Sequence, residues 1–164
     1  RGFFSELWNK KSLSNIGINI EIVQENQAYS KKPKTLRGLH FQSPPFAQSK
    51  LVRCSRGSIL DVAVDIRKGS PTFGKWVAEE ISSENGKQIL IPEGFLHGYV
   101  TNKPNTEVIY VCSNYYEPTS EGSVRFDDPE INIDWKTNRK DVIVSRKDLE
   151  ASSFKELNSP FIYE

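Results

Sequence analysis

Turn-forming residues recur through the middle of this chain at intervals of about ten residues, and this spacing limits the folds that it can adopt. Runs rich in β-branched and aromatic residues lie between the turns. The turn sequences are Arg56-Gly57, Lys68-Gly69-Ser70-Pro71, Glu84-Asn85-Gly86, Pro92-Glu93-Gly94, Lys103-Pro104-Asn105 and Glu121-Gly122. Many short strands at this spacing are typical of a β-sandwich or a β-barrel.

The clearest predicted strand covers residues 59–66. Its even positions are all apolar, whereas its odd positions include Asp61 and Asp65, so the pattern predicts a strand with one buried face. Weaker patterns of the same kind predict strands over residues 18–24, 36–42, 50–54, 76–81, 88–91 and 107–112.

Helix signals are confined to the two ends of the chain, over residues 6–13 and about 147–157. Ser145 followed by Asp148 has the form of a capping box at the start of the second helix. No internal repeat or linker marks a boundary, so residues 1–164 are predicted to form a single domain. The expected fold is all-β, a jelly-roll β-barrel with short terminal helices.

Composition excludes several classes of function. The 22 lysines and arginines nearly balance the 21 acidic residues and are scattered, so no basic surface for nucleic acid is expected. No apolar run approaches the roughly 20 residues of a membrane span, and no secretory signal is visible. Cys54 and Cys112 both lie in apolar strands and are expected to be free thiols, which favours a cytoplasmic location.

The chain contains only two histidines, His40 and His97. Metal-binding jelly rolls typically need two or three histidines with a carboxylate, so neither a metal nor another cofactor is expected. Period two places His40 and Gln42 on one face of a strand, and a bulge at Gly38 would bring Arg37 to the same cavity. The alternative interpretation is a half-exposed edge strand with an incidental histidine.

Three other candidate residues have structural explanations of their own. Tyr110 shares a strand face with Val108 and Cys112, which is typical of a core tyrosine. Asp148 fits the capping box that begins at Ser145. Lys50 has the position of a solvated residue on an edge strand. None of these residues alone indicates a function.

Taken together and in order, several motifs resemble the dTDP-4-dehydrorhamnose 3,5-epimerase family of metal-free cupins, and the resemblance covers essentially the whole chain. The motifs are Arg1-Gly2-Phe3-Phe4, Val23-Gln24-Glu25-Asn26, Leu36-Arg37-Gly38-Leu39-His40-Phe41-Gln42, Ala47-Gln48-Ser49-Lys50-Leu51-Val52-Arg53, Asp61-Val62-Ala63-Val64-Asp65-Ile66-Arg67, Gly69-Ser70-Pro71-Thr72-Phe73-Gly74, Ile91-Pro92-Glu93-Gly94-Phe95-Leu96-His97-Gly98, Asn114-Tyr115-Tyr116 and Ile133-Asp134-Trp135.

The resemblance implies a cupin-type jelly-roll barrel that inverts C3 and C5 of a nucleotide-linked 4-keto-6-deoxy sugar. It makes His40 the base, Asp148 the carboxylate that orients it, Lys50 the cation beside the keto oxygen and Tyr110 the acid. It also implies a homodimer in which the amino-terminal segment serves the partner's pocket. The implied substrate-binding residues are Arg1, Phe4, Glu6, Gln24, Asn26, Arg37, Gln42, His97 and Tyr116.

Two departures from the family pattern stand out. Family members usually begin with an additional strand before the Arg1-Gly2-Phe3-Phe4 motif, and several have lysine at the position of Val111. The residues leave open a relative that inverts only C3 or only C5, or that accepts another nucleotide or a heptose. A noncatalytic jelly roll that binds sugar nucleotides and a metal-dependent cupin oxygenase are the alternatives from other classes.

Overall fold

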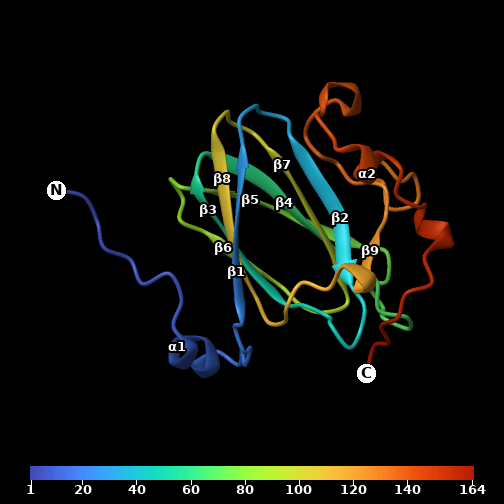
Figure 1. The fold of residues 1–164 in the computed structure, drawn as a ribbon, viewed down its shortest axis with the longest axis horizontal. Coiled ribbons are helices and arrows are strands. Elements are labelled where there is room, and N and C mark those ends of the chain that lie inside the picture. The colour runs from blue at the N-terminus through green and yellow to red at the C-terminus, as the bar shows by residue number, and fades with distance from the viewer.

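Two antiparallel sheets face each other in the computed structural model, which describes residues 1–164 (Figure 1). The first has the strand order β1-β8-β3-β6 and the second β5-β4-β7-β2-β9. The strands are β1 Gln24–Ser30, β2 Leu36–Gln42, β3 Lys50–Arg56, β4 Ser58–Asp65, β5 Trp76–Ser82, β6 Gln88–Ile91, β7 Phe95–Thr101, β8 Thr106–Cys112 and β9 Glu121–Ser123. The predicted all-β class is confirmed.

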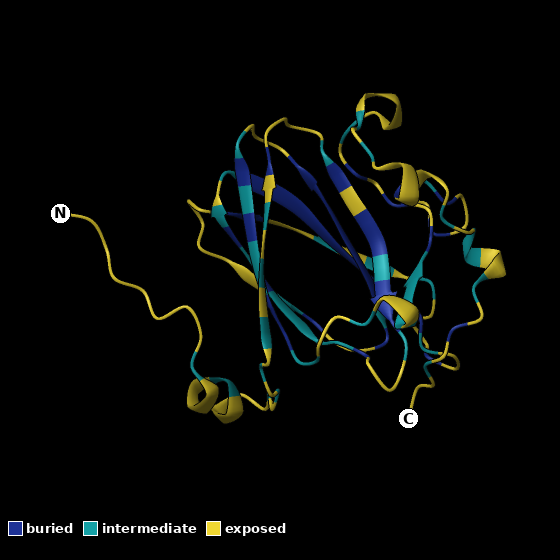
Figure 2. Ribbon diagram, in the orientation of Figure 1, coloured by how far each residue is buried: buried dark blue, intermediate teal, exposed yellow.

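Strand β4 is buried on both faces, so the prediction of one buried face was wrong (Figure 2). Ile59 and Ala63 point into the barrel, where they pack with Val52 and Val108 of the opposite sheet. The even positions 60–66 lie on the outer face, beneath the carboxyl-terminal segment 124–161. That segment contributes Val124, Phe126, Ile131, Ile133 and Trp135 to a second buried cluster.

The first strand lies further along the chain than predicted. Residues 18–24 were expected to form it, but β1 begins at Gln24, and all seven of its residues pair with β8. Upstream of Gln24, only the Val23 N–H extends the pairing, by donating to Cys112 O at 3.0 Å. The partner strand, more than the local apolar pattern, therefore decides where this strand lies.

The terminal helices are shorter than predicted. Helix α1 covers Lys10–Asn15, after an N-cap at Asn9, and α2 covers only Arg146–Leu149. A continuous helix over 147–157 does not form, because Arg125 N–H donates to Ser152 O and Phe154 N–H donates to the Asp128 carboxylate. Short 3-10 turns lie at Pro118–Ser120, Arg139–Asp141 and Phe154–Glu156. None of the helices has the length and apolar character of a membrane span.

The bulge predicted at Gly38 is present. The register between β2 and β7 shifts between Arg37 and His40, and Gly38 has φ +119°. A Cβ atom at Gly38 would lie 2.6 Å from the Cα of Gly98 on β7, so only glycine fits this crossing. The bulge lets Arg37 and His40 line the same cavity.

Candidate active site

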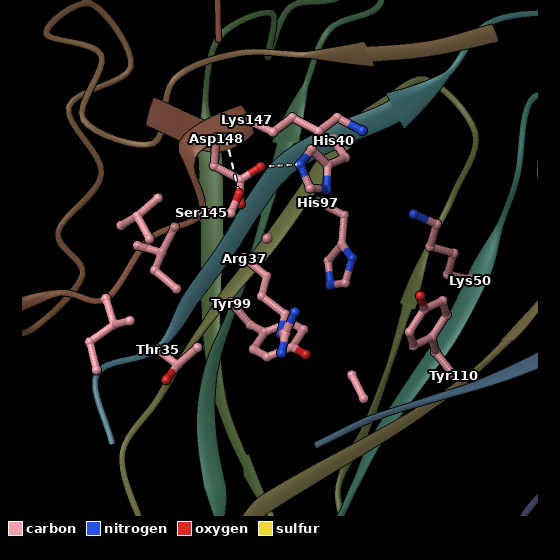
Figure 3. Close-up of a pocket in the computed structure, with 15 residues that line it drawn as sticks. Thr35, Arg37, His40, Lys50, His97, Tyr99, Tyr110, Ser145, Lys147 and Asp148 are labelled. Atoms are coloured by element: carbon pink, nitrogen blue, oxygen red, sulfur yellow. Dashed lines mark hydrogen bonds and ion pairs between the residues drawn. The ribbon is translucent and has the colours of Figure 1, made fainter. Parts of the chain in front are cut away.

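The interior of the barrel opens into a cleft with two lobes, of about 480 Å³ and 320 Å³. His40, Lys50 and Tyr110 line both lobes and therefore lie where the lobes meet. His40 comes from β2 of the five-stranded sheet, whereas Lys50 and Tyr110 come from β3 and β8 of the four-stranded sheet. Figure 3 shows the histidine on one side of the cavity and the other two side chains across from it.

His40 is held by a buried carboxylate. Its Nε2 donates to Asp148 Oδ1 at 2.6 Å, and Asp148 Oδ2 accepts the Gly38 N–H at 3.3 Å. The Asp148 side chain is only 4% exposed. Although burial acts to raise the pKa of Asp148, hydrogen bonds from His40 and Gly38 lower it overall, so the carboxyl group is ionised. An ionised acceptor fixes the ring proton on Nε2 and leaves Nδ1 with a free lone pair.

The capping-box explanation accounts for only half of what Asp148 does. Ser145 caps α2, because its Oγ accepts the Asp148 N–H at 3.1 Å. The Asp148 side chain, however, turns into the barrel toward His40 instead of toward the backbone of Ser145. The short helix α2 therefore serves to place a carboxylate behind the histidine.

Lys50 is no edge residue, because β3 lies between β8 and β6. Its Nζ is 5.9 Å from the centroid of the Tyr110 ring, and neither side chain hydrogen-bonds to another protein group. Burial lowers the pKa of Lys50 and raises the pKa of Tyr110. The cavity thus holds a lysine amino group and a protonated phenol, neither of which has a protein hydrogen-bond partner, so both are free to meet a ligand.

Polar side chains from β1, β2 and the segment after β8 form the second lobe, among them Gln24, Asn26, Gln42 and Tyr116. Gln42 has all of its hydrogen-bonding groups engaged: Nε2 donates to Phe46 O and Tyr115 O, and Oε1 accepts the Glu117 N–H. Gln24 Oε1 accepts the Tyr116 N–H, and its Nε2 donates to Asn26 Oδ1. Gln42 therefore shapes this wall more than it offers a free group to a ligand.

His97 and Arg37 lie in the first lobe. His97 Nε2 donates to both oxygens of Asp61, at 2.9 and 3.1 Å, and Asp61 is fully buried. Arg37 Nη2 donates to Tyr29 O at 3.2 Å, and Arg37 is exposed to solvent. Arg37 is thus a cation at the mouth of this lobe.

Three predicted site residues do not reach the cleft of their own chain. Residues 1–4 extend away from the barrel in Figure 1, and Phe4 is 96% exposed, whereas Leu7 O accepts a hydrogen bond from Gln88 Nε2 of β6 at 2.7 Å. Glu6 accepts a hydrogen bond from Asn9 Nδ2, and neither Arg1 nor Glu6 lines the cleft.

The structure adds cleft residues that the sequence interpretation missed. Glu121 Oε2 accepts hydrogen bonds from Lys147 Nζ at 2.6 Å and from Tyr116 Oη at 2.8 Å. Tyr99 lines the first lobe, two positions after His97. Lys147 could have been predicted to lie near the cleft, because it immediately precedes Asp148 in the sequence. Glu121 could not, because Glu121-Gly122 was interpreted as a turn. No group of three or more His, Cys, Asp or Glu side chains in the structure is arranged to hold a metal ion.

Comparisons with known proteins agree with one another. A family model described as dTDP-4-dehydrorhamnose 3,5-epimerase matches residues 1–156. The enzyme of that name from Salmonella typhimurium is 52% identical over 82% of this chain and 74% of its own length. The solved dTDP-6-deoxy-D-glucose-3,5-epimerase of Legionella pneumophila, in complex with dTDP-4-keto-L-rhamnose, is 41% identical with a TM-score of 0.94, and the match covers 99% of this chain and 87% of that one. A 3′-monoepimerase from Streptomyces bikiniensis in complex with dTDP-quinovose is 32% identical with a TM-score of 0.81, over 90% of this chain and 74% of that one.

Proposed function

The chain belongs to the dTDP-4-dehydrorhamnose 3,5-epimerase family, and we propose from this premise that its cleft converts dTDP-4-dehydro-6-deoxyglucose to dTDP-4-dehydrorhamnose. The observation that carries the proposal is the placement of His40 on one sheet, where Asp148 of α2 binds it, opposite Lys50 and Tyr110 on the other sheet. We propose that the substrate, a nucleotide diphosphate sugar like those bound in the solved relatives, lies between the two sheets.

The 4-keto group makes the neighbouring C3–H and C5–H bonds acidic, and the cleft supplies the groups that proton removal requires. His40 takes the proton through Nδ1, because Nε2 is committed to Asp148. The negative charge that develops on the keto oxygen is stabilised by Lys50, whose ammonium has no other protein partner. The Asp148 carboxylate stabilises the imidazolium that forms.

Inversion requires that the enolate receive its new proton on the face opposite to the base. Tyr110 projects from the sheet that faces His40, and burial raises the pKa of its hydroxyl, which keeps the proton in place until the enolate accepts it. The same base and acid serve C3 and C5 in turn when the sugar ring reorients within the cleft.

The direct test is incubation of the protein with dTDP-4-keto-6-deoxyglucose in deuterated water, with NMR used to locate the deuterium. We expect deuterium at both C3 and C5, with both centres inverted. Inversion at C3 alone would match the activity named for the Streptomyces relative and would restrict the function to one centre. The absence of any deuterium uptake would identify a noncatalytic binding protein and contradict the proposal.

We further propose that the protein acts as a homodimer whose amino-terminal segment completes the partner's cleft. Support comes from Phe3 and Phe4, which are 92% and 96% exposed on a segment that extends away from its own barrel. Large apolar side chains in such positions are typical of interaction sites. Arg1 and Glu6 on the same segment would add charged contacts to the substrate in the partner's cleft.

Complementation tests this arrangement. A His40→Asn chain has an intact amino-terminal segment, and an Arg1→Ala, Phe4→Ala chain has an intact His40. Each alone is expected to have little activity, and mixing the two should restore part of it, because mixed dimers contain one complete site. No recovery in mixtures that demonstrably exchange subunits, or full activity of a monomer in light scattering, would contradict the dimer proposal.

The location and domain organisation are proposed on separate grounds. Cys54 and Cys112 are both free and buried, which is consistent with the reducing cytoplasm. Residues 1–164 are proposed to fold as one domain, because the carboxyl-terminal segment supplies five of the 14 residues of the larger buried cluster on the five-stranded sheet. A stable fragment that ends before Val124 would contradict this second point.

A further inference from the structure

One buried polar atom has no hydrogen-bond partner, and it lies at the cleft. Among the side-chain nitrogen and oxygen atoms that are fully shielded from solvent, only the Tyr99 hydroxyl is unpaired, whereas Lys50 and Tyr110 are partly open to the cleft. The residue is 4% exposed. Leaving a buried hydroxyl unpaired is destabilising, so such a group in a native protein requires an explanation.

The ring of Tyr99 forms part of the wall of the first lobe. Tyr99 lies on β7, paired with Arg37 on β2 and with Asp61 on β4. It is two positions after His97, so both side chains point into the barrel, with ring centroids 6.3 Å apart. Figure 3 shows Tyr99 on the cavity side of the sheet, beside Arg37.

No neighbouring polar group lies within hydrogen-bond distance of the Tyr99 hydroxyl, because these groups bond to other partners. Both Asp61 oxygens accept from His97 Nε2, and Arg37 donates to Tyr29 O. Burial raises the pKa of Tyr99, so its hydroxyl keeps its proton and is available as a donor. What the site lacks is an acceptor, and a nucleotide sugar carries acceptor oxygens on its phosphates and on its sugar.

We propose that the Tyr99 hydroxyl donates a hydrogen bond to an oxygen of the bound nucleotide sugar beside Arg37, which makes Tyr99 a substrate-binding and specificity-determining residue. The inference rests on the proposed function. Because the hydroxyl is shielded in the free protein, the contact requires an adjustment of neighbouring side chains, of which Arg37 is the most exposed. The acceptor lies either on the diphosphate or on the sugar.

The test is Tyr99→Phe, which removes the hydroxyl and keeps the ring. An unpaired buried hydroxyl does not stabilise the free protein, so the Tm of the unliganded variant should be unchanged or higher. Its kcat/KM should fall about tenfold, the usual effect when a ligand oxygen loses its partner. Tyr163→Phe is the matched control, because Tyr163 lies outside the cleft against Arg67, and it should change neither quantity.

Calorimetry with two unreactive probes locates the acceptor. A loss of affinity of Tyr99→Phe for dTDP places the acceptor on the nucleotide diphosphate, whereas a loss confined to dTDP-glucose places it on the sugar. Unchanged affinity for both probes together with kcat/KM within twofold of the unmodified protein would overturn the inference, as would a lower Tm of the unliganded variant. If the unmodified protein inverted neither centre, the proposed function itself would have failed, and the two failures are thereby distinguishable.

Discussion

His40 and His97 are cross-strand partners on β2 and β7, and Nε2 of each ring is bound to a different buried aspartate, Asp148 for His40 and Asp61 for His97. The two pairs differ in access to the cleft, because the His40 side chain is 29% exposed and that of His97 only 8%. His40 is therefore the histidine placed to exchange a proton with a ligand, and the His97–Asp61 pair forms a fixed part of the wall.

Replacing His40 by Asn is expected to abolish deuterium uptake at both C3 and C5, since one base is proposed to serve both centres. A positioned general base contributes about 10²–10⁴-fold to the rate. Asp148→Asn keeps the imidazole but loses its orienting carboxylate, so its uptake should be lower than that of the unmodified protein and higher than that of His40→Asn. Uptake near the native rate in His40→Asn would rule out this histidine as the base.

Lys50→Met should lower the rate of deuterium uptake about 10²–10³-fold, the usual effect of removing one group that stabilises an oxyanion. Because burial lowers the pKa of Lys50, the unmodified enzyme should lose kcat/KM at alkaline pH below the ordinary lysine pKa of about 10.4, as the ammonium deprotonates. That alkaline limb should disappear in Lys50→Met. The exposed Lys32→Met is the control, and the same loss in both variants would remove Lys50 from the mechanism.

Activity is expected to survive exhaustive chelation. Each histidine already uses Nε2 to bind an aspartate, and no third metal-binding side chain completes a site. The assay is kcat/KM before and after chelation, with atomic absorption to verify that the metal has been removed. Loss of activity that one added divalent metal restores would contradict this prediction.

Asp65 is expected to control the stability of the protein in acid. Burial alone would raise its pKa, but hydrogen bonds from Arg67, Ser70 and Thr72 lower it well below the ordinary value. A carboxyl group whose pKa is lowered in the folded state stabilises the fold above its unfolded pKa of about 3.9, and this contribution is lost as the pH falls below that value.

Asp65→Asn should therefore destabilise the protein at neutral pH by about 1–3 kcal/mol, since the partly exposed Arg67 and the hydroxyls of Ser70 and Thr72 lose a charged acceptor, and should flatten the decline of stability below pH 4. Denaturant unfolding across pH 2–7 measures both effects. Asp141→Asn, at an exposed carboxylate, is the control and should leave the pH profile unchanged. An acid limb equally steep in Asp65→Asn would assign the effect to other carboxylates.

The sequence predicted the strands that are rich in apolar residues. It misplaced β1 and missed β7, because the positions of these strands depend on their pairing with distant parts of the chain. The polar strand β1 forms because β8 offers it a complete set of partners. Strand β7 was not predicted, because Gly98 interrupts its apolar pattern. The structure requires glycine at this position, since a Cβ atom added at Gly98 would lie only 2.8 Å from the backbone oxygen of Arg37 on β2. The outer cluster beneath residues 124–161 likewise depends on contacts between distant segments.

The same limit applies to the candidate site. His40, Lys50, Tyr110 and Asp148 were identified from motifs, and the structure brings them to one cleft. Tyr99 was overlooked because an aromatic residue in a strand is usually part of the core. Its unpaired hydroxyl is visible only when every possible partner from three strands has been placed around it.

Tyr110→Phe tests the central claim, that a base on one sheet and an acid on the other act on opposite faces of the sugar. With His40 and Lys50 intact, the enolate should still form, and His40 can return a solvent-exchanged proton to the original face. Initial rates of deuterium uptake into recovered substrate and of epimer formation are compared for native protein and Tyr110→Phe of matched Tm. The account predicts uptake that continues while inversion fails; an unchanged ratio of the two rates would contradict it and return Tyr110 to a structural role.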